Sequence, residues 1–283
     1  MRFGPAGNSE RFYAEGHKST AEAPAWLAGL GLDAMEYSFG RGVQLSQSAA
    51  EKIAEAACEH GIRMSAHAPY FVNLANPDPE KREKSLRYIL DVAQAVKRLG
   101  GDRVVVHVGA QMELERAEAL ANCRAGVAEA YRRLEDAGLG EIHLCPETMG
   151  KRAQIGDLAE TLSLCLSDAR LIPCVDFAHL HALTGGGLRE EADFVRVLDA
   201  AEVALGVERA RGMHIHFSTI EFTGAGEKRH RTFAEADYGP RFEQLAPLLA
   251  ARGYHGTVIC ECSGTQADDA AAMQALWRQF LGR

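Results

Sequence analysis

The sequence lacks any long apolar run. No stretch approaches the roughly 18 consecutive apolar residues that a membrane-spanning helix needs. The first residues, from Met1 to Pro5, are not followed by the apolar segment of a signal peptide. We therefore expect a soluble, cytoplasmic protein that has no membrane partner.

The sequence also lacks patterned cysteine. Its seven cysteines are scattered and odd in number, and no two of them form a Cys-x-x-Cys pair. This excludes a disulfide framework and a thiolate zinc knuckle, and it suits a reducing compartment. The Gly-rich segment at 184–187 lacks the Lys-Ser/Thr of a phosphate-binding loop, which argues against nucleotide binding there.

No linker, sequence repeat or low-complexity segment divides the chain. With 283 residues, of which 47% are hydrophobic, it can bury one large core. The net charge of −8 gives no general attraction to nucleic acid. Clustered acids can nevertheless bind cations, which would reverse the local field, so the charge leaves a DNA substrate open.

Short apolar runs alternate with amphipathic segments along the whole chain, which is typical of repeated β-α units around a parallel sheet. The expected strands are 2–4, 34–37, 63–67, 103–107, 142–147, 171–176, 211–217 and 257–261. The expected helices are 21–29, 48–60, 79–99, 114–137, 157–166, 190–205, 240–252 and 268–281. Eight such units predict an α/β fold, a single-domain (β/α)8 TIM barrel over residues 1–283. The segment 219–238 is expected to be an irregular, functional loop.

Six successive strands end on a residue that can bind a metal ion. In a barrel these ends converge on one rim, so residues distant in the sequence become neighbours there. Imidazoles and carboxylates suit zinc, manganese or iron, and a carboxylate can bridge two ions, which predicts two or three ions. Ordinary strand-end polar residues would not be expected six times in succession. The six residues are His67, His107, Glu147, Asp176, His214 and Glu261.

Further histidines lie close to these positions. His179 stands in an Asp-x-x-His spacing after Asp176, whereas the place of His181 suits a capping or supporting hydrogen bond. His214 and His216 alternate in one strand and point to the same face. One of them is expected to bind a metal ion and the other to donate a supporting hydrogen bond.

The ordered motifs resemble those of the endonuclease IV family of apurinic/apyrimidinic endonucleases, over about two-thirds of the chain. They are Ser-Ala-His67-Ala-Pro-Tyr70-Phe-Val-Asn73, Val-Val-His107-Val-Gly109, Pro-Glu147-Thr-Met-Gly150, Asp176-Phe-Ala-His179, Gly-Met-His214, Lys228-Arg-His230 and Ile-Cys-Glu261. The resemblance implies a metal-dependent barrel that cuts DNA 5′ to abasic sites in base excision repair.

The resemblance also assigns roles to residues. His67, His107 and Glu147 resemble the ligands of one zinc ion, and Glu147 would bridge to a second ion held by Asp176, His214 and Glu261. His179 and His230 resemble two ligands of a third. Glu147 and Glu261 would be the catalytic carboxylates, with Glu261 orienting the attacking water.

One departure from the family concerns the third ion, because Lys228-Arg229-His230 stands where the family has Asp-x-His. The third site is then short of a ligand, completed by His216, or completed by a carbamylated Lys228. This keeps two other functions open. One is a sugar isomerase or epimerase of the same barrel superfamily, and the other is a DNA-damage binding protein with an incomplete third site. The UV-damage endonucleases have a similar rim.

DNA contacts are expected from the loops at the rim. Tyr70 resembles the residue that family members place at the abasic gap, although it could simply cover the barrel mouth. The side chains available for the DNA backbone are Arg41, Asn73, Lys151, Arg152, Arg229 and Arg231. Each of these could equally be an ordinary solvated side chain. We expect a monomer.

Overall fold

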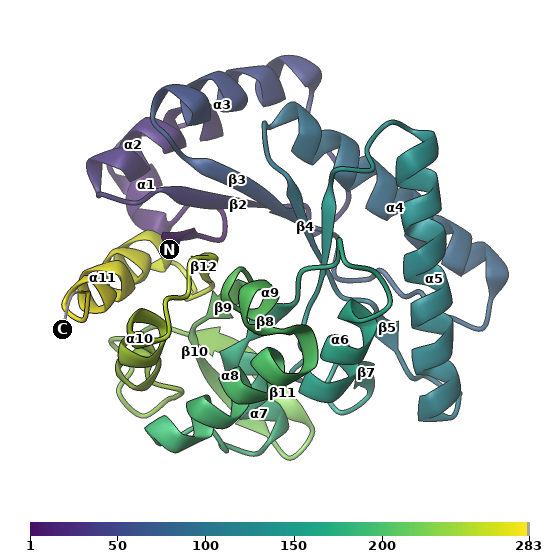
Figure 1. Ribbon diagram of the computed structural model, residues 1–283. Helices are drawn as coiled ribbons and strands as arrows, with labels where there is room; N and C mark the ends of the chain where they lie inside the picture. The colour runs from purple at the N-terminus through teal and green to yellow at the C-terminus, as the bar shows by residue number, and fades with distance from the viewer. Residues whose placement is uncertain (282–283) are drawn as a thin grey trace.

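The structure, a computed structural model, describes residues 1–281. Two four-stranded parallel sheets, ordered β1-β12-β9-β8 and β2-β3-β4-β6, form the walls of a barrel. Parallel bridges between Ala6 and Glu36 and between Glu147 and Cys174 join the sheets on both sides. The predicted (β/α)8 barrel is therefore confirmed (Figure 1). Its strands are β1 (Arg2–Pro5), β2 (Ala34–Ser38), β3 (Arg63–His67), β4 (Arg103–Val106), β6 (His143–Pro146), β8 (Cys174–Asp176), β9 (His214–Phe217) and β12 (Thr257–Cys260).

Helices surround the barrel (Figure 1). In α4 the buried residues Leu86, Ile89, Val92 and Val96 recur every three or four positions, so one face of the helix packs against the strands. The Asp78 side chain caps that helix by accepting from the Glu80 amide. The helices are α1 (Glu10–Ala14), α2 (Ala23–Gly29), α3 (Gln47–Glu59), α4 (Pro79–Arg98), α5 (Arg116–Asp136), α6 (Leu158–Cys165), α7 (Phe177–Leu183), α8 (Glu191–Leu205), α9 (Val207–Arg211), α10 (Phe242–Ala251) and α11 (Gln266–Arg278), with a short 3-10 turn at Thr20–Glu22.

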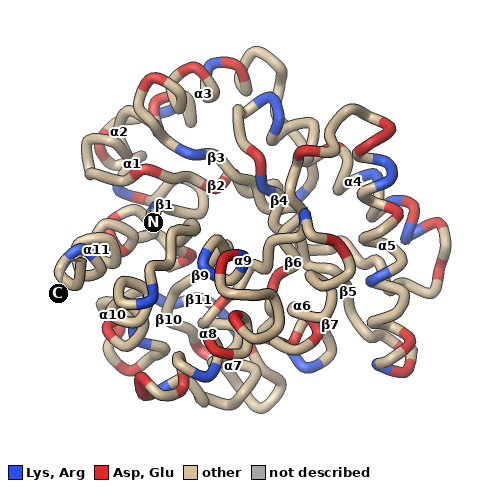
Figure 2. The backbone as a smooth tube through the Cα atoms, viewed as in Figure 1, with Lys and Arg blue, Asp and Glu red and all other residues tan. Residues whose placement is uncertain are grey.

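The main core lies between the strands and the helices. Apolar strand residues such as Val104, Val106 and Val258 are fully buried, and Phe217 packs edge-on against Phe242 at 5.0 Å between ring centroids. Acidic and basic residues are interspersed along the outer helices (Figure 2). Among residues 1–281, no helix combines the length and the apolar character needed to cross a bilayer.

The structure differs from the expected elements mainly at the rim. The segment expected to be irregular forms an antiparallel hairpin, β10 (Thr219–Thr223) and β11 (Gly226–Arg231). A second small pair joins β5 (Gly109–Ala110) to β7 (Gln154–Ile155). Helices α1, α7 and α9 were also not predicted. The strands before His107, Glu147 and Glu261 end one residue earlier than expected, so these three side chains directly follow their strands.

Candidate metal centre

The carboxyl ends of the strands surround a cavity of about 370 Å³. Its lining comes from elements that are far apart in the sequence, because the barrel brings their strand ends together. Most of the predicted ligands contribute to it. The lining includes His67, Tyr70, His107, Glu147, Lys151, Gln154, His179, Glu227, His230 and Glu261.

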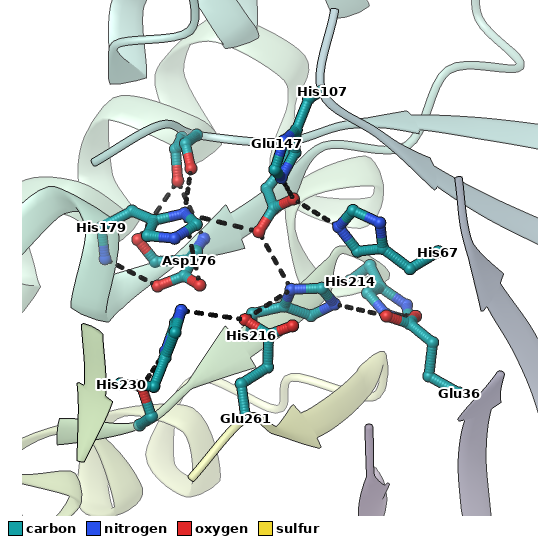
Figure 3. Close-up of polar contacts among 12 residues, drawn as sticks. Glu36, His67, His107, Glu147, Asp176, His179, His214, His216, His230 and Glu261 are labelled. Carbon is teal, nitrogen blue, oxygen red and sulfur yellow. Dashed lines mark hydrogen bonds and ion pairs between the residues drawn. The ribbon is translucent and has the colours of Figure 1, made fainter. Parts of the chain in front are cut away.

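His67 and His107 meet the buried carboxylate of Glu147 in a first ligand group. Glu147 Oε2 lies 3.0 Å from His67 Nε2 and 2.9 Å from His107 Nε2 (Figure 3). His67 Nδ1 lies 2.6 Å from the Ala68 carbonyl, which can only accept, so Nδ1 carries a proton. A cation shared by His67 and Glu147 would displace any proton from Nε2 and bind its lone pair.

The other side of Glu147 contributes to a second group with Asp176, His216 and Glu261. His216 Nδ1 lies 3.0 Å from Glu147 Oε1 and 3.5 Å from Glu261 Oε2. Asp176 accepts from the His179 amide through Oδ1 at 2.7 Å, whereas its buried Oδ2 has no hydrogen-bond partner among residues 1–281. A buried carboxylate oxygen without a donor is costly. The oxygen and nitrogen atoms of this group therefore fit the ligands of a metal ion.

The shifted pKa values of the buried carboxylates and histidines also indicate a site suited to a cation. Burial raises the pKa of Asp176 to about 6, with the carboxylates of Glu261 and Glu147 adding to the rise against the effect of His179. Burial would also raise the pKa of Glu147, but His216 and His107 hold it well below its usual range. Burial alone would lower the pKa of His67, but in the absence of a cation the contact with Glu147 and the charges of Glu147, Glu36 and Glu261 together raise it to about 9. Imidazoles that can themselves bind metal thus supply the opposite charge beside the buried carboxylates.

The structure exchanges the roles suggested for the two histidines of β9. The sheet register pairs His216 with Asp176 and His214 with Cys174, so His214 lies one layer deeper in the barrel. His214 Nε2 contacts Glu36 Oε2 at 3.0 Å, and Figure 3 shows the His214 ring beside the Glu36 carboxylate. The family resemblance placed His214 among the ligands of the second ion and at the end of its strand. In the structure His214 begins β9, and His216 is the histidine beside Glu147 and Glu261.

A third group consists of His179, Glu227 and His230. His179 Nε2 lies 3.6 Å from Glu227 Oε2, and the rings of His179 and His230 are 5.4 Å apart. Ser218 Oγ lies 2.6 Å from His230 Nδ1, which leaves His230 Nε2 for the cavity. These ligands come from α7 and from the β10–β11 hairpin.

Lys228 does not join this group. The register of the hairpin shifts at Glu221, which pairs with Arg229 while Phe222 pairs with Glu227, so Lys228 is the extra residue of a β-bulge. Because of the bulge, Lys228 and Arg229 point toward Glu221. Glu227 faces His179 instead, on the same side of the hairpin as His230. Glu227, three residues before His230, is therefore the side chain that stands with His179 and His230, where a carbamylated Lys228 or His216 was expected to complete the third site.

Close backbone contacts hold Glu227 in place. The Glu227 amide donates to the Gly150 carbonyl at 2.9 Å. A Cβ on Gly150 would lie 2.7 Å from the Glu227 Cβ, and Gly226 has a φ of 104°. Both positions therefore require glycine. Sequence reasoning missed Glu227, although the Glu-x-x-His spacing would indicate it once a bulge is allowed for.

The expected DNA-contacting residues are not all available. Tyr70 borders the cavity with 61% of its surface exposed. Asn73 is used inside the protein, because its Oδ1 accepts from the amides of Ala75 and Ala110.

Some basic residues of the rim are paired with a carboxylate, and others are exposed and free to contact DNA. Arg229 and Arg231 pair with Glu221, which offsets their charge. Exposed Lys151 lines the cavity, whereas exposed Arg41 and Arg152 lie outside its lining. His181 also lies apart from the three ligand groups, where it accepts from the Leu188 amide.

Comparisons with known proteins agree with the architecture. The family model described as "Xylose isomerase-like TIM barrel" matches residues 24–279. An uncharacterized protein of Methanocaldococcus jannaschii, MJ0133, is 33% identical over 88% of each chain. A probable endonuclease 4 of Chlorobium phaeobacteroides is 25% identical over 61% of each.

Two solved structures resemble the whole fold. Endonuclease IV from Thermus thermophilus superimposes with a TM-score of 0.74 at 23% identity, covering 99% of this chain and all of that one. A D-psicose 3-epimerase superimposes with a TM-score of 0.69 at 18% identity, with full coverage of both chains. The chain belongs to the xylose isomerase-like TIM barrel family.

Proposed function

We propose that the protein is a metal-dependent phosphodiesterase that cleaves DNA 5′ to abasic sites, with zinc as the metal and manganese or iron as alternatives. The observation that carries this proposal is the arrangement of three neighbouring groups of possible ligands at and just below one cavity, two of which share the buried carboxylate of Glu147. Closely spaced metal ions suit the in-line displacement at a phosphodiester, where both the attacking and the leaving oxygen need stabilisation.

The ligand set divides naturally among the ions. His67, His107 and Glu147 would hold the first, Glu147, Asp176, His216 and Glu261 the second, and His179, Glu227 and His230 the third. When bound, the metals would lower the pKa of a water molecule and offset the charge of the phosphate. Imidazole and carboxylate ligands accept zinc, manganese and iron alike.

The chain's own residues would position the substrate. Glu261, which lines the cavity, would orient the attacking water through its carboxylate. The exposed ammonium of Lys151 at the same cavity would pair with a phosphate oxygen. Tyr70 at the edge would stack in the gap left by the missing base. The similarity to a probable endonuclease 4 supports this substrate class.

The competing candidate is a sugar epimerase. It is favoured by the similarity of fold to D-psicose 3-epimerase and by the buried second group, which could hold a single ion by itself. A one-ion site would leave His107 and the group of His179, Glu227 and His230 without a role. A DNA-damage binding protein with an incomplete third site is disfavoured because Glu227 occupies the place of the missing ligand.

A nicking assay on metal-loaded protein tests the proposal. The substrates are a duplex with one abasic site, the same duplex intact, and a panel of ketoses. We expect cleavage 5′ to the abasic site that stops on chelation and returns with zinc or manganese. Epimerisation of a ketose without nicking would establish the alternative, and tight binding of the abasic duplex without cleavage would indicate a binding protein.

A further inference from the structure

Glu36 is a buried carboxylate beneath the metal centre, and nothing in the predicted ligand set accounts for it. It lies in the middle of β2, is fully buried, and points into the barrel toward β9. Figure 3 shows it on the side of His216 that faces away from Glu147. Burying a carboxylate destabilises the folded protein unless neighbouring groups pair with its charge.

Hydrogen bonds fix one of its two oxygens. Glu36 Oε2 accepts from Ser65 Oγ at 2.9 Å and from His214 Nε2 at 3.0 Å. Ser65 and His214 come from β3 and β9, so the carboxylate is held between strands on two sides of the barrel. This leaves the other oxygen, Oε1, in a defined position.

Oε1 faces His216. It lies 3.0 Å from His216 Nε2, close enough for an ion pair but not aligned as a hydrogen bond. Among residues 1–281 neither atom has a hydrogen-bond partner, so a small rotation of the ring would let the two satisfy each other. The opposite nitrogen of the same ring, Nδ1, lies 3.0 Å from Glu147 Oε1 in the second ligand group. An imidazole whose outer N–H donates to a carboxylate keeps its inner lone pair for a metal and becomes a stronger ligand.

We propose that Glu36 is a positioning residue that acts through His216: it accepts the Nε2 proton, fixes the tautomer, and directs Nδ1 at the second metal position. The inference rests on the proposed metal centre but not on DNA as the substrate. It also accounts for the second histidine of β9, since His214 serves to hold Glu36.

The competing use of this pocket is a separate metal site formed by Cys174, His214 and His216, whose ligand atoms lie within 4.8 Å of one another. Burial raises the pKa of the Cys174 thiol, which opposes the thiolate that a metal would need. Cobalt reports on this directly, because a thiolate ligand adds a charge-transfer absorption that histidine and carboxylate ligands lack.

The test compares cobalt and zinc affinities of metal-free protein for the wild type, Glu36→Gln, Ser65→Ala and His216→Asn, by competition with a chelator. Glu36→Gln keeps the shape of the side chain and removes its charge, and we expect the second ion to bind roughly 10- to 100-fold more weakly. Ser65→Ala removes one of the two hydrogen bonds that hold the same carboxylate but keeps its charge, so we expect a smaller loss of affinity than in Glu36→Gln. In the His216→Asn background, Glu36→Gln should cause no further loss.

A second measurement does not depend on any variant folding. In zinc-loaded wild-type protein, nitrogen–proton correlation spectra of labelled histidine should place the His216 proton on Nε2. Unchanged affinity in Glu36→Gln, a further loss in the double variant, a proton on Nδ1, or a thiolate absorption band would each overturn the inference. All of these are binding or spectroscopic readouts, so a failure of DNA cleavage would leave them intact.

Discussion

The inner and outer parts of the metal centre are built in different ways. The inner candidate ligands Glu147, Asp176 and His216 lie on or directly after barrel strands and are fully buried. Two of the outer ligands, Glu227 and His230, sit on the β10–β11 hairpin, with 17% and 23% of their side chains exposed. The barrel register fixes the inner set, whereas one bulge and two glycines place the outer set. We therefore expect substitutions of the inner candidate ligands to reduce metal binding and cleavage more than substitutions of the outer ones.

The largest effect is expected at the shared inner carboxylate. Glu147→Gln keeps the shape but removes the charge that two ions would share, so cleavage of an abasic duplex should fall by at least about a hundredfold. Metal analysis should show that ions are lost, while circular dichroism should show an intact barrel. Retained cleavage with full metal content would contradict the bridging role.

The outer part is expected to fail separately. Glu227→Gln should remove one ion and leave the inner ions bound, because its contacts lie on the hairpin and on His179. We expect cleavage to fall by roughly 10- to 100-fold, a smaller loss than at Glu147. Metal stoichiometry measured beside the nicking rate tests this. If all ions were lost together, the inner and outer parts would not be independent.

This difference also explains what the sequence could predict. Eight short apolar runs that alternate with amphipathic segments indicate a barrel, and the strand ends then locate His67, His107, Glu147, Asp176 and Glu261. The choice between His214 and His216 depends on depth within the barrel, which alternation along one strand does not reveal. Glu227 was missed because a bulge breaks the alternation that predicts which side chains share a face. Glu36 was missed because its partners lie on strands distant in the sequence.

The rim is expected to affect DNA affinity without affecting the metals. Tyr70 borders the cavity but belongs to none of the three ligand groups. Stacking on a base gap contributes about 1–3 kcal/mol, so Tyr70→Ala should weaken binding to an abasic duplex roughly tenfold. Binding to the undamaged duplex and the metal content should both stay near wild type. Equal losses on both duplexes would make Tyr70 a packing residue.

The smallest effect is expected at Lys228, next to the outer ligand Glu227. Its ammonium pairs with Glu221, and 54% of its side chain is exposed on the face of the hairpin turned away from His230. Glu221 also holds Arg229 and Arg231, and exposed ion pairs contribute little to stability. Lys228→Ala should therefore leave metal content, cleavage and thermal stability unchanged.

Lys228→Asp, which would restore the usual residue of the endonuclease IV family, tests more strictly whether position 228 can contribute a ligand. Lys228→Asp would place a carboxylate beside Glu221 and add no ligand at His230, because the bulge directs position 228 outward. We expect the metal content not to rise and the melting temperature to fall slightly through like-charge repulsion. A carbamylated lysine would instead be established by two results together: Lys228→Ala loses an ion, and the wild type keeps that ion only when bicarbonate is supplied. The outer ion would then depend on Lys228 and not on the bulge that presents Glu227.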